Sequence, residues 1–114
     1  MIAIVDYGAG NLTSVKKAFD HLGAESAVTA DPSVVRAADR IAVPGVGHFA
    51  ATRVLADSGL REAALDAIAR GIPFLGICVG MQWLFEASQE SPQTLGLGIF
   101  QGTCERFPDR KSVV

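Results

Sequence analysis

Short apolar runs alternate with segments of helical spacing along most of the chain. Residues 2–5 form an unbroken apolar run rich in β-branched side chains, which is typical of a strand covered on both faces. Further short runs predict strands at residues 25–29, 41–43 and 74–77. Strands that alternate with helices indicate βαβ units, so the pattern predicts an α/β fold with a mostly parallel sheet and helices on both faces.

Helical patterns fill the segments between these runs. Asn11 is the predicted N-cap of the first helix, and Gly23 stands where a glycine commonly ends one. Further helices are predicted to open at residues 31–33, to span 49–57 and 60–70, and to begin directly after Gly80 with apolar residues as far as 85. Beyond residue 88 loop signals give way, at residues 99–107, to a late strand or hairpin.

The composition is that of one globular domain. The chain has 114 residues, of which 49% are hydrophobic and 19% charged. At this size folding buries roughly 65% of the unfolded chain's surface, so we expect a single domain over residues 1–114 without a stabilising disulfide or metal. The formal net charge is −2, and the absence of a long basic run argues against a nucleic-acid partner.

The cysteines and the amino terminus bear on cofactors and location. Cys78 and Cys104 form no CxxC motif, which argues against zinc and against a secreted disulfide scaffold. No basic residue precedes Lys16, so the start of the chain does not resemble a signal peptide. No apolar run approaches the ~20 residues of a membrane span. We therefore expect a reduced, cytoplasmic protein with no metal, no cofactor and no membrane contact.

Parallel α/β sheets bind their ligands at the carboxyl ends of the strands, which selects the loops at residues 8–11, 44–48 and 76–80. The third loop, Gly76-Ile77-Cys78-Val79-Gly80, has the form of a nucleophile elbow. Its glycines avoid a collision between strand and helix, and the helix dipole favours a Cys78 thiolate. The N–H of Val79 would then lie where it can stabilise an oxyanion. The alternative interpretation is a small buried cysteine after a core strand.

The other two loops are less specific. Pro44-Gly45-Val46-Gly47 follows the neighbouring strand, and its glycines would let a backbone N–H approach a ligand as a second oxyanion donor. The alternative is an ordinary Pro-Gly turn. Gly8-Ala9-Gly10 favours dinucleotide binding only weakly, because Thr13 stands where the fingerprint has its third glycine, and a plain strand-to-helix turn is the alternative.

A cysteine nucleophile needs a base within hydrogen-bond distance, and the chain has two histidines. His21 ends a predicted helix, where interaction with the helix dipole explains an imidazole. His48 lies beside the second loop but begins a helical pattern, which makes it a weak candidate. From the residues alone, the acid–base machinery is missing or lies elsewhere.

Three motifs occur together and in order: Asp6-Tyr7-Gly8-Ala9-Gly10-Asn11-Leu12, Pro44-Gly45-Val46-Gly47-His48-Phe49 and Gly76-Ile77-Cys78-Val79-Gly80-Met81-Gln82. Together they closely resemble the class I glutamine amidotransferases and, within these, the glutaminase subunits of imidazole glycerol phosphate synthase in histidine biosynthesis. The elbow with Gly80-Met81-Gln82 is shared widely in the class, whereas the opening motif is much narrower. The resemblance implies a flavodoxin-like three-layer fold, truncated at its carboxyl end.

The resemblance also implies a chemistry and a partner. Cys78 would attack the side-chain amide carbon of glutamine, release ammonia and leave a thioester that water hydrolyses to glutamate. Val46 and Val79 would offer the oxyanion N–H groups, and the substrate-binding positions would be Gly45, Gly47 and Gln82. Ammonia would pass to a cyclase subunit with a (β/α)₈ barrel. Asn11, at the carboxyl end of a strand, is the candidate for that interface.

One part of the family pattern is not found. The catalytic His and Glu of the family lie in a His-x-Glu motif, and the chain stops at Val114 before any such motif. We therefore expect the 114-residue chain by itself to hydrolyse glutamine negligibly, for lack of a base. Two alternatives stay open: a non-catalytic α/β interaction module that retains the fold, and a cysteine-elbow hydrolase of another substrate, which Gln82 disfavours.

Overall fold

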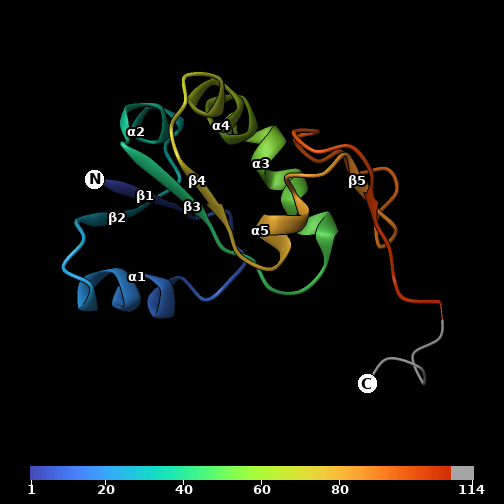
Figure 1. Cartoon of the computed structure of the whole chain (residues 1–114), viewed down its shortest axis with the longest axis horizontal. Helices are drawn as coiled ribbons and strands as arrows, with labels where there is room; N and C mark the ends of the chain where they lie inside the picture. Colours follow the sequence, from blue (N-terminus) through green and yellow to red (C-terminus); the bar gives the residue numbers. More distant parts are fainter. Residues whose placement is uncertain (109–114) are drawn as a thin grey trace.

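The structure is a computed structural model that describes residues 1–108, so the predicted domain end at residue 114 lies outside the described residues. Its main sheet has four parallel strands in the order β2-β1-β3-β4 (Figure 1). These strands are β1 (Ile2–Val5), β2 (Ser26–Thr29), β3 (Arg40–Val43) and β4 (Phe74–Gly76). Ile4 is paired with Val28 on one side and Ala42 on the other, and Val43 is paired with Gly76.

The first two helices begin directly after the capping side chains of Asn11 and Asp31, whereas the last helix begins at Val79, before its predicted start after Gly80. The helices are α1 (Leu12–His21), α2 (Pro32–Ala37), the 3₁₀ helix η1 (Phe49–Thr52), α3 (Arg53–Asp57), α4 (Leu60–Ala69) and α5 (Val79–Gln82). The Asn11 side chain accepts a hydrogen bond from the Ser14 N–H at 3.2 Å, and Asp31 does the same for the Ser33 N–H at 2.9 Å. Gly23 has a φ of +72°, the left-handed conformation that ends a helix.

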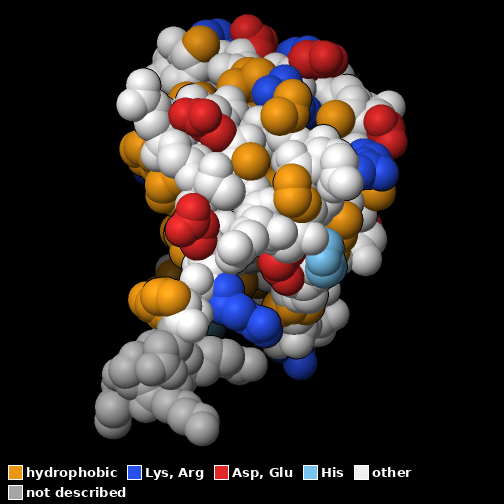
Figure 2. Space-filling model, turned by 90° about the vertical axis from the view of Figure 1, so that its right-hand side faces the viewer, with side chains coloured by type: hydrophobic (Ala, Val, Ile, Leu, Met, Phe, Trp, Pro, Cys, Tyr) orange, Lys and Arg blue, Asp and Glu red, His pale blue; other side chains and the backbone are white. Residues whose placement is uncertain are grey.

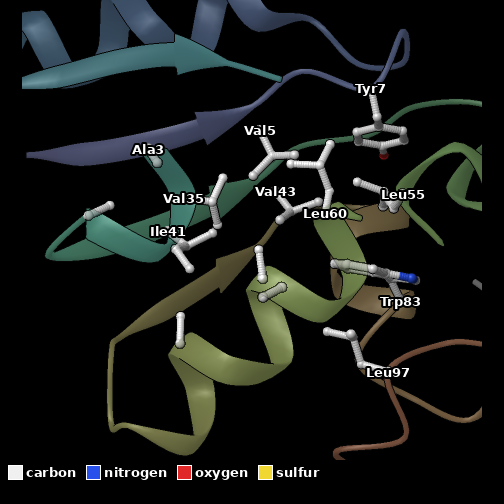
Figure 3. Packing of buried hydrophobic residues seen from close by; sticks show 14 of the residues in the cluster. Ala3, Val5, Tyr7, Val35, Ile41, Val43, Leu55, Leu60, Trp83 and Leu97 are labelled. Atoms are coloured by element: carbon white, nitrogen blue, oxygen red, sulfur yellow. The ribbon is translucent and has the colours of Figure 1, made fainter. Parts of the chain in front are cut away.

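The two faces of the sheet carry cores of different size. Because side chains alternate along a strand, Ala3 and Val5 point to one face and Ile2 and Ile4 to the other. The first face packs against α2, α3 and α4 in the larger cluster (Figure 3), and the second against α1. Figure 1 shows α1 on one side of the sheet and α2 and α4 on the other. The predicted three-layer, flavodoxin-like architecture is therefore confirmed.

The carboxyl-terminal part departs from the prediction in two ways. Helix α5 ends at Gln82 rather than near residue 85. The carbonyls of residues 83–86 instead accept hydrogen bonds from N–H groups of residues 96–100, including Leu97 to Trp83 at 2.7 Å and Gly96 to Glu86 at 2.8 Å. Of the late strand or hairpin predicted at residues 99–107, the strand is present as β6 (Thr103–Cys104), but it pairs in parallel with β5 (Ala87–Ser88) rather than in a hairpin. The crossover at residues 89–102 supplies the length that a parallel pair requires.

No helix among residues 1–108 combines the length and the apolar composition needed to cross a bilayer.

Candidate active site

The three predicted loops meet at the carboxyl edge of the sheet. They are the first loop (residues 6–11) after β1, the Gly45 loop (residues 44–48) after β3 and the elbow (residues 76–80) at the end of β4. A Cβ on Gly10 would lie 3.1 Å from the Gly45 nitrogen, so the first loop packs directly on the Gly45 loop. The N–H of Val79 donates to the carbonyl of Gly45 at 3.2 Å, which joins the Gly45 loop to the elbow.

Cys78 has the backbone conformation of a nucleophile elbow. Its φ of 55° and ψ of −115° make it the one non-glycine residue with positive φ among those described. Such a conformation costs on the order of 1–3 kcal/mol and persists only where the surroundings impose it. Helix α5 begins at the next residue, and the thiol is exposed and not in a disulfide. The structure thus places a reachable thiol on a strained strand-to-helix turn.

The glycines beside Cys78 are required by space, as the sequence predicts. A Cβ on Gly76 would lie 2.7 Å from the carbonyl carbon of Gly80, and a Cβ on Gly80 would collide with the carbonyl oxygen of Val43. Both contacts are with backbone, which cannot turn aside as the end of a side chain can. The elbow is therefore fixed by close packing of β3, β4 and α5.

The Tyr7 side chain holds the Gly45 loop from the buried side. The Tyr7 side chain is buried, and its hydroxyl donates to the carbonyl of Pro44 at 2.7 Å. Burial raises the pKa of Tyr7 to about 12, so the phenol remains a protonated donor at neutral pH. Gly45 is buried, whereas the side chain of Val46 is exposed, so the loop turns outward between these two residues.

The two predicted oxyanion N–H groups do not converge in this conformation. The Val79 N–H is occupied by the Gly45 carbonyl. Since a trans peptide directs its N–H and C=O to opposite sides, the N–H of Val46 points away from Val79. The predicted roles of Val46 and Val79 stay predictions, and they require the Gly45–Val46 peptide to turn over.

Neither histidine is placed as a base for Cys78. The Nδ1 atom of His48 accepts a hydrogen bond from the Ala50 N–H at 3.1 Å, which makes His48 the N-cap of η1. His21 is the exposed last residue of α1, where it faces the negative end of the helix dipole. Within residues 1–108 the Cys78 thiol makes no hydrogen bond. Nor do three His, Cys, Asp or Glu side chains come together there as a metal site.

A pocket of about 840 Å³ lies between the Gly45 loop, helix α5 and the segment around β5 and β6, and no residue of the elbow is among those that line it. Two predicted substrate-binding residues, Gly47 and Gln82, contribute to its lining, and the Oε1 atom of Gln82 is buried without a hydrogen-bond partner. The opposite wall consists of residues that sequence reasoning missed: Ser88, Gln89, Glu90, Cys104, Glu105, Arg106, Phe107 and Pro108. Figure 2 shows acidic and basic side chains interspersed on the side of the molecule where β5 lies.

No local pattern in the sequence predicts this second wall. Two-residue strands are too short to show an alternation of apolar and polar residues, and β5 and β6 pair only through the fold. That pairing brings Gln89 beside Arg106. The backbone N–H of Arg106 donates to the Gln89 Oε1 atom at 2.9 Å. The wall therefore depends on contacts that lie far apart along the chain.

The remaining predicted residues are placed as follows. Asn11 is exposed and its side chain caps α1, and its part in a subunit interface stays a prediction. Gly10 serves the close approach to the Gly45 backbone and Gly8 adopts a φ of +84°, so the weak dinucleotide pattern has a structural explanation.

Comparison with known proteins agrees with this geometry. The model of the family "Glutamine amidotransferase class-I" matches residues 3–109. The chain belongs to this family. A solved structure described as a crystal structure of glutamine amidotransferase superposes with a TM-score of 0.80 over 96% of this chain and 60% of the other, at 20% identity, which supports the fold. The family membership confirms that the elbow and its neighbouring loops lie on an amidotransferase scaffold.

Curated relatives carry a more specific name. The protein named imidazole glycerol phosphate synthase subunit HisH in Methanopyrus kandleri is 50% identical over 109 residues, which cover 95% of this chain and 54% of that relative. The protein of the same name in Nitrosospira multiformis is 54% identical over 110 residues, covering 94% and 51% respectively. The chain thus spans about half the length of the curated relatives that it matches.

Proposed function

We propose that this chain carries the nucleophile of a glutaminase subunit of imidazole glycerol phosphate synthase, which hydrolyses glutamine and passes ammonia to a cyclase. The observation that carries the proposal is Cys78, an exposed thiol with a φ of 55° on the elbow of a class I amidotransferase scaffold. The similarity to HisH proteins at about half identity supports the specific subunit.

In the proposed reaction the Cys78 thiolate attacks the side-chain amide carbon of glutamine. The C–N bond breaks as the nitrogen takes a proton and leaves as ammonia, and a thioester forms. Water then attacks the thioester, which yields glutamate and restores the thiol. The proton transfers require a base, which we assign to the family's His-x-Glu pair in the half of the relatives that this chain does not span.

The oxyanion of each step would be stabilised by the N–H groups of Val79 and Val46. One such donor contributes about 10²–10³ in kcat. Because the Gly45 carbonyl occupies the Val79 N–H at 3.2 Å, the Gly45–Val46 peptide has to rotate before either donor can act. We therefore propose that the described conformation is a resting one and that the partner subunit or substrate favours the rotated one.

The pocket between the Gly45 loop, α5 and the wall around β5 and β6 carries charges that suit an amino acid. Glu90 and Glu105 supply acidic side chains for the ammonium group of glutamine, and Arg106 supplies a basic one for its carboxylate. The unpartnered Oε1 atom of Gln82 is an acceptor ready for a donor of the substrate. Gly47 keeps the loop free of a side chain where the substrate would lie, and Gly45 lets the loop approach the elbow.

The proposed partner is a (β/α)₈ cyclase subunit, with Asn11 as the candidate contact. Asn11 is exposed at the carboxyl edge of the sheet, and the loop that ends with it touches the Gly45 loop. Both cysteines are free, which supports a reducing, cytoplasmic location.

The test is selective labelling of Cys78 in the complete gene product by a glutamine-derived chloroketone at neutral pH. We expect Cys78 to be modified well before Cys104, because burial raises the pKa of the Cys104 thiol. Cys78→Ala should abolish glutamine hydrolysis measured with the cyclase subunit present, whereas the matched Cys104→Ala should retain it. Slow, equal labelling of both thiols together with absent hydrolysis would favour a non-catalytic module.

A further inference from the structure

One buried polar contact near the elbow involves a side chain that the proposed reaction does not use. The Tyr7 hydroxyl donates to the carbonyl of Pro44 at 2.7 Å, across the gap between the first loop and the Gly45 loop. Figure 3 shows Tyr7 just beyond the end of β1, with its hydroxyl turned toward Leu55. The side chain is only 5% exposed, so this hydrogen bond is shielded from water.

The contact lies next to the peptide that blocks the Val79 N–H. The Pro44 carbonyl belongs to the Pro44–Gly45 peptide, and the carbonyl that accepts from Val79 belongs to the following peptide. Gly45 is the joint between the two. A Cβ on Gly45 would collide with the Tyr7 hydroxyl and lie 3.0 Å from the Val79 Cβ, so the joint is enclosed by the tyrosine on one side and the elbow on the other.

From this arrangement we propose that Tyr7 is a positioning residue for glutamine hydrolysis, because its hydroxyl fixes the Pro44–Gly45 peptide as the hinge about which the Gly45–Val46 peptide turns. The inference rests on the proposed glutaminase function. With the hydroxyl bound, rotation changes only the torsions on either side of the Gly45–Val46 peptide, and the Val46 N–H arrives at a defined position. Without it, the whole loop can shift and the donor is poorly placed.

The role is distinct from that of a core residue that only stabilises the fold. Tyr7→Phe keeps the buried ring and removes the one atom that reaches Pro44, so packing against the core is retained. The chain offers a matched control in Thr52, whose buried hydroxyl also donates to a backbone carbonyl, that of Phe49, at 2.7 Å. Thr52→Val therefore removes a buried hydrogen bond of the same type and length that joins two residues of η1 and does not involve the Pro44–Gly45 peptide.

The experiment compares wild type, Tyr7→Phe and Thr52→Val in the complete gene product with its cyclase subunit. For Tyr7→Phe we expect kcat of glutamine hydrolysis to fall about tenfold, a fraction of the loss of a whole oxyanion donor, with KM within twofold of wild type. Thr52→Val should keep kcat within twofold. By residue-resolved amide exchange, the Val79 N–H should exchange faster in Tyr7→Phe, while the Trp83 N–H, which donates to Val79 within the helix, should not change.

The inference is overturned if kcat of Tyr7→Phe stays within twofold of wild type, or if Thr52→Val lowers kcat as much, since either result removes any special role of the hydroxyl. Failure of the proposed function looks different: wild type would then hydrolyse no glutamine even with the cyclase. In that case the Val79 exchange rate still decides whether Tyr7 holds the joint, and an unchanged rate rejects it.

Discussion

The elbow and the Gly45 loop lie against each other, yet they are held in place by different forces. At the elbow, backbone packs on backbone: the sites of Gly76 and Gly80 have no room for a methyl group, and Cys78 is held at a φ of 55°. The Gly45 loop is closely packed only at Gly45, and the peptides on either side of that residue are held by two hydrogen bonds, one from the Tyr7 hydroxyl and one from the Val79 N–H. Close packing allows one conformation, whereas a hydrogen bond can be exchanged for another.

The difference suggests that the nucleophile and the oxyanion donors of the proposed reaction are positioned at different times. The nucleophile is fixed before any substrate arrives, because the strain at Cys78 is maintained by the surrounding backbone. The oxyanion donors are assembled later, when the Val79 N–H exchanges the Gly45 carbonyl for the oxyanion. Under this proposal the oxyanion site stays incomplete until the Gly45–Val46 peptide turns, although the Cys78 thiol is exposed throughout.

The largest expected effect comes from breaking the elbow. Gly80→Ala places a methyl group onto the carbonyl oxygen of Val43, and neither backbone can yield without parting β3 from α5. We expect the free energy of unfolding to fall by about 3 kcal/mol or more, the upper range for overpacking, as measured by denaturant unfolding of the complete gene product.

Gly71→Ala is the control for this substitution. Gly71 has a φ of +85° but nothing within 4 Å of an added Cβ, so only the conformational cost of about 1–2 kcal/mol applies. Equal destabilisation by the two substitutions would contradict the steric account of the elbow.

The next effect concerns Gly45, the joint of the Gly45 loop. We expect a substitution there to lower the free energy of unfolding less than Gly80→Ala does, but to lower kcat strongly. Gly45→Ala brings a Cβ against the Tyr7 hydroxyl, which should displace the loop and lower kcat of glutamine hydrolysis about 100-fold, as for the loss of one oxyanion donor. In Gly45→Ala/Tyr7→Phe the colliding oxygen is gone. The combined loss in the free energy of unfolding should therefore be smaller than the sum of the single losses, by about 0.5–3 kcal/mol. Additive losses would show that the hydroxyl and the joint do not interact.

The sequence predicts the elbow better than the loop for the same physical reason. Gly76 packs against Gly80 only four positions away, so the spacing around Cys78 reveals the elbow, although the backbone that excludes a side chain at Gly80 is that of Val43 in β3. The apolar runs of β1, β3 and β4 are local in the same sense. The orientation of the Gly45–Val46 peptide depends instead on Tyr7 and Val79, which are distant along the chain and close only after folding.

The same limit applies to the carboxyl-terminal part. A hairpin is the expected pairing for neighbouring segments, but the carbonyls of residues 83–86 are taken by residues 96–100, and this forces β5 and β6 into parallel pairing. The position of Arg106 in the wall of the pocket is therefore not predicted by the local sequence. Motif spacing located the proposed nucleophile, while the second wall of the pocket required the tertiary structure.

The smallest expected effect concerns His48 on the Gly45 loop. Of the two histidines in the described chain, His48 is the one that the sequence offered as a weak candidate for the base. Its Nδ1 atom caps η1 by accepting from the Ala50 N–H at 3.1 Å. Asparagine is among the best N-cap residues, so His48→Asn should change the free energy of unfolding by only a few tenths of a kcal/mol, while His48→Ala should cost about 1 kcal/mol. Both variants should keep kcat within twofold of wild type, because a cap takes no part in proton transfer. If His48 were the base, His48→Asn would lower kcat by about 10²–10⁴-fold while retaining the cap. This one variant therefore separates the role of helix cap from the role of general base.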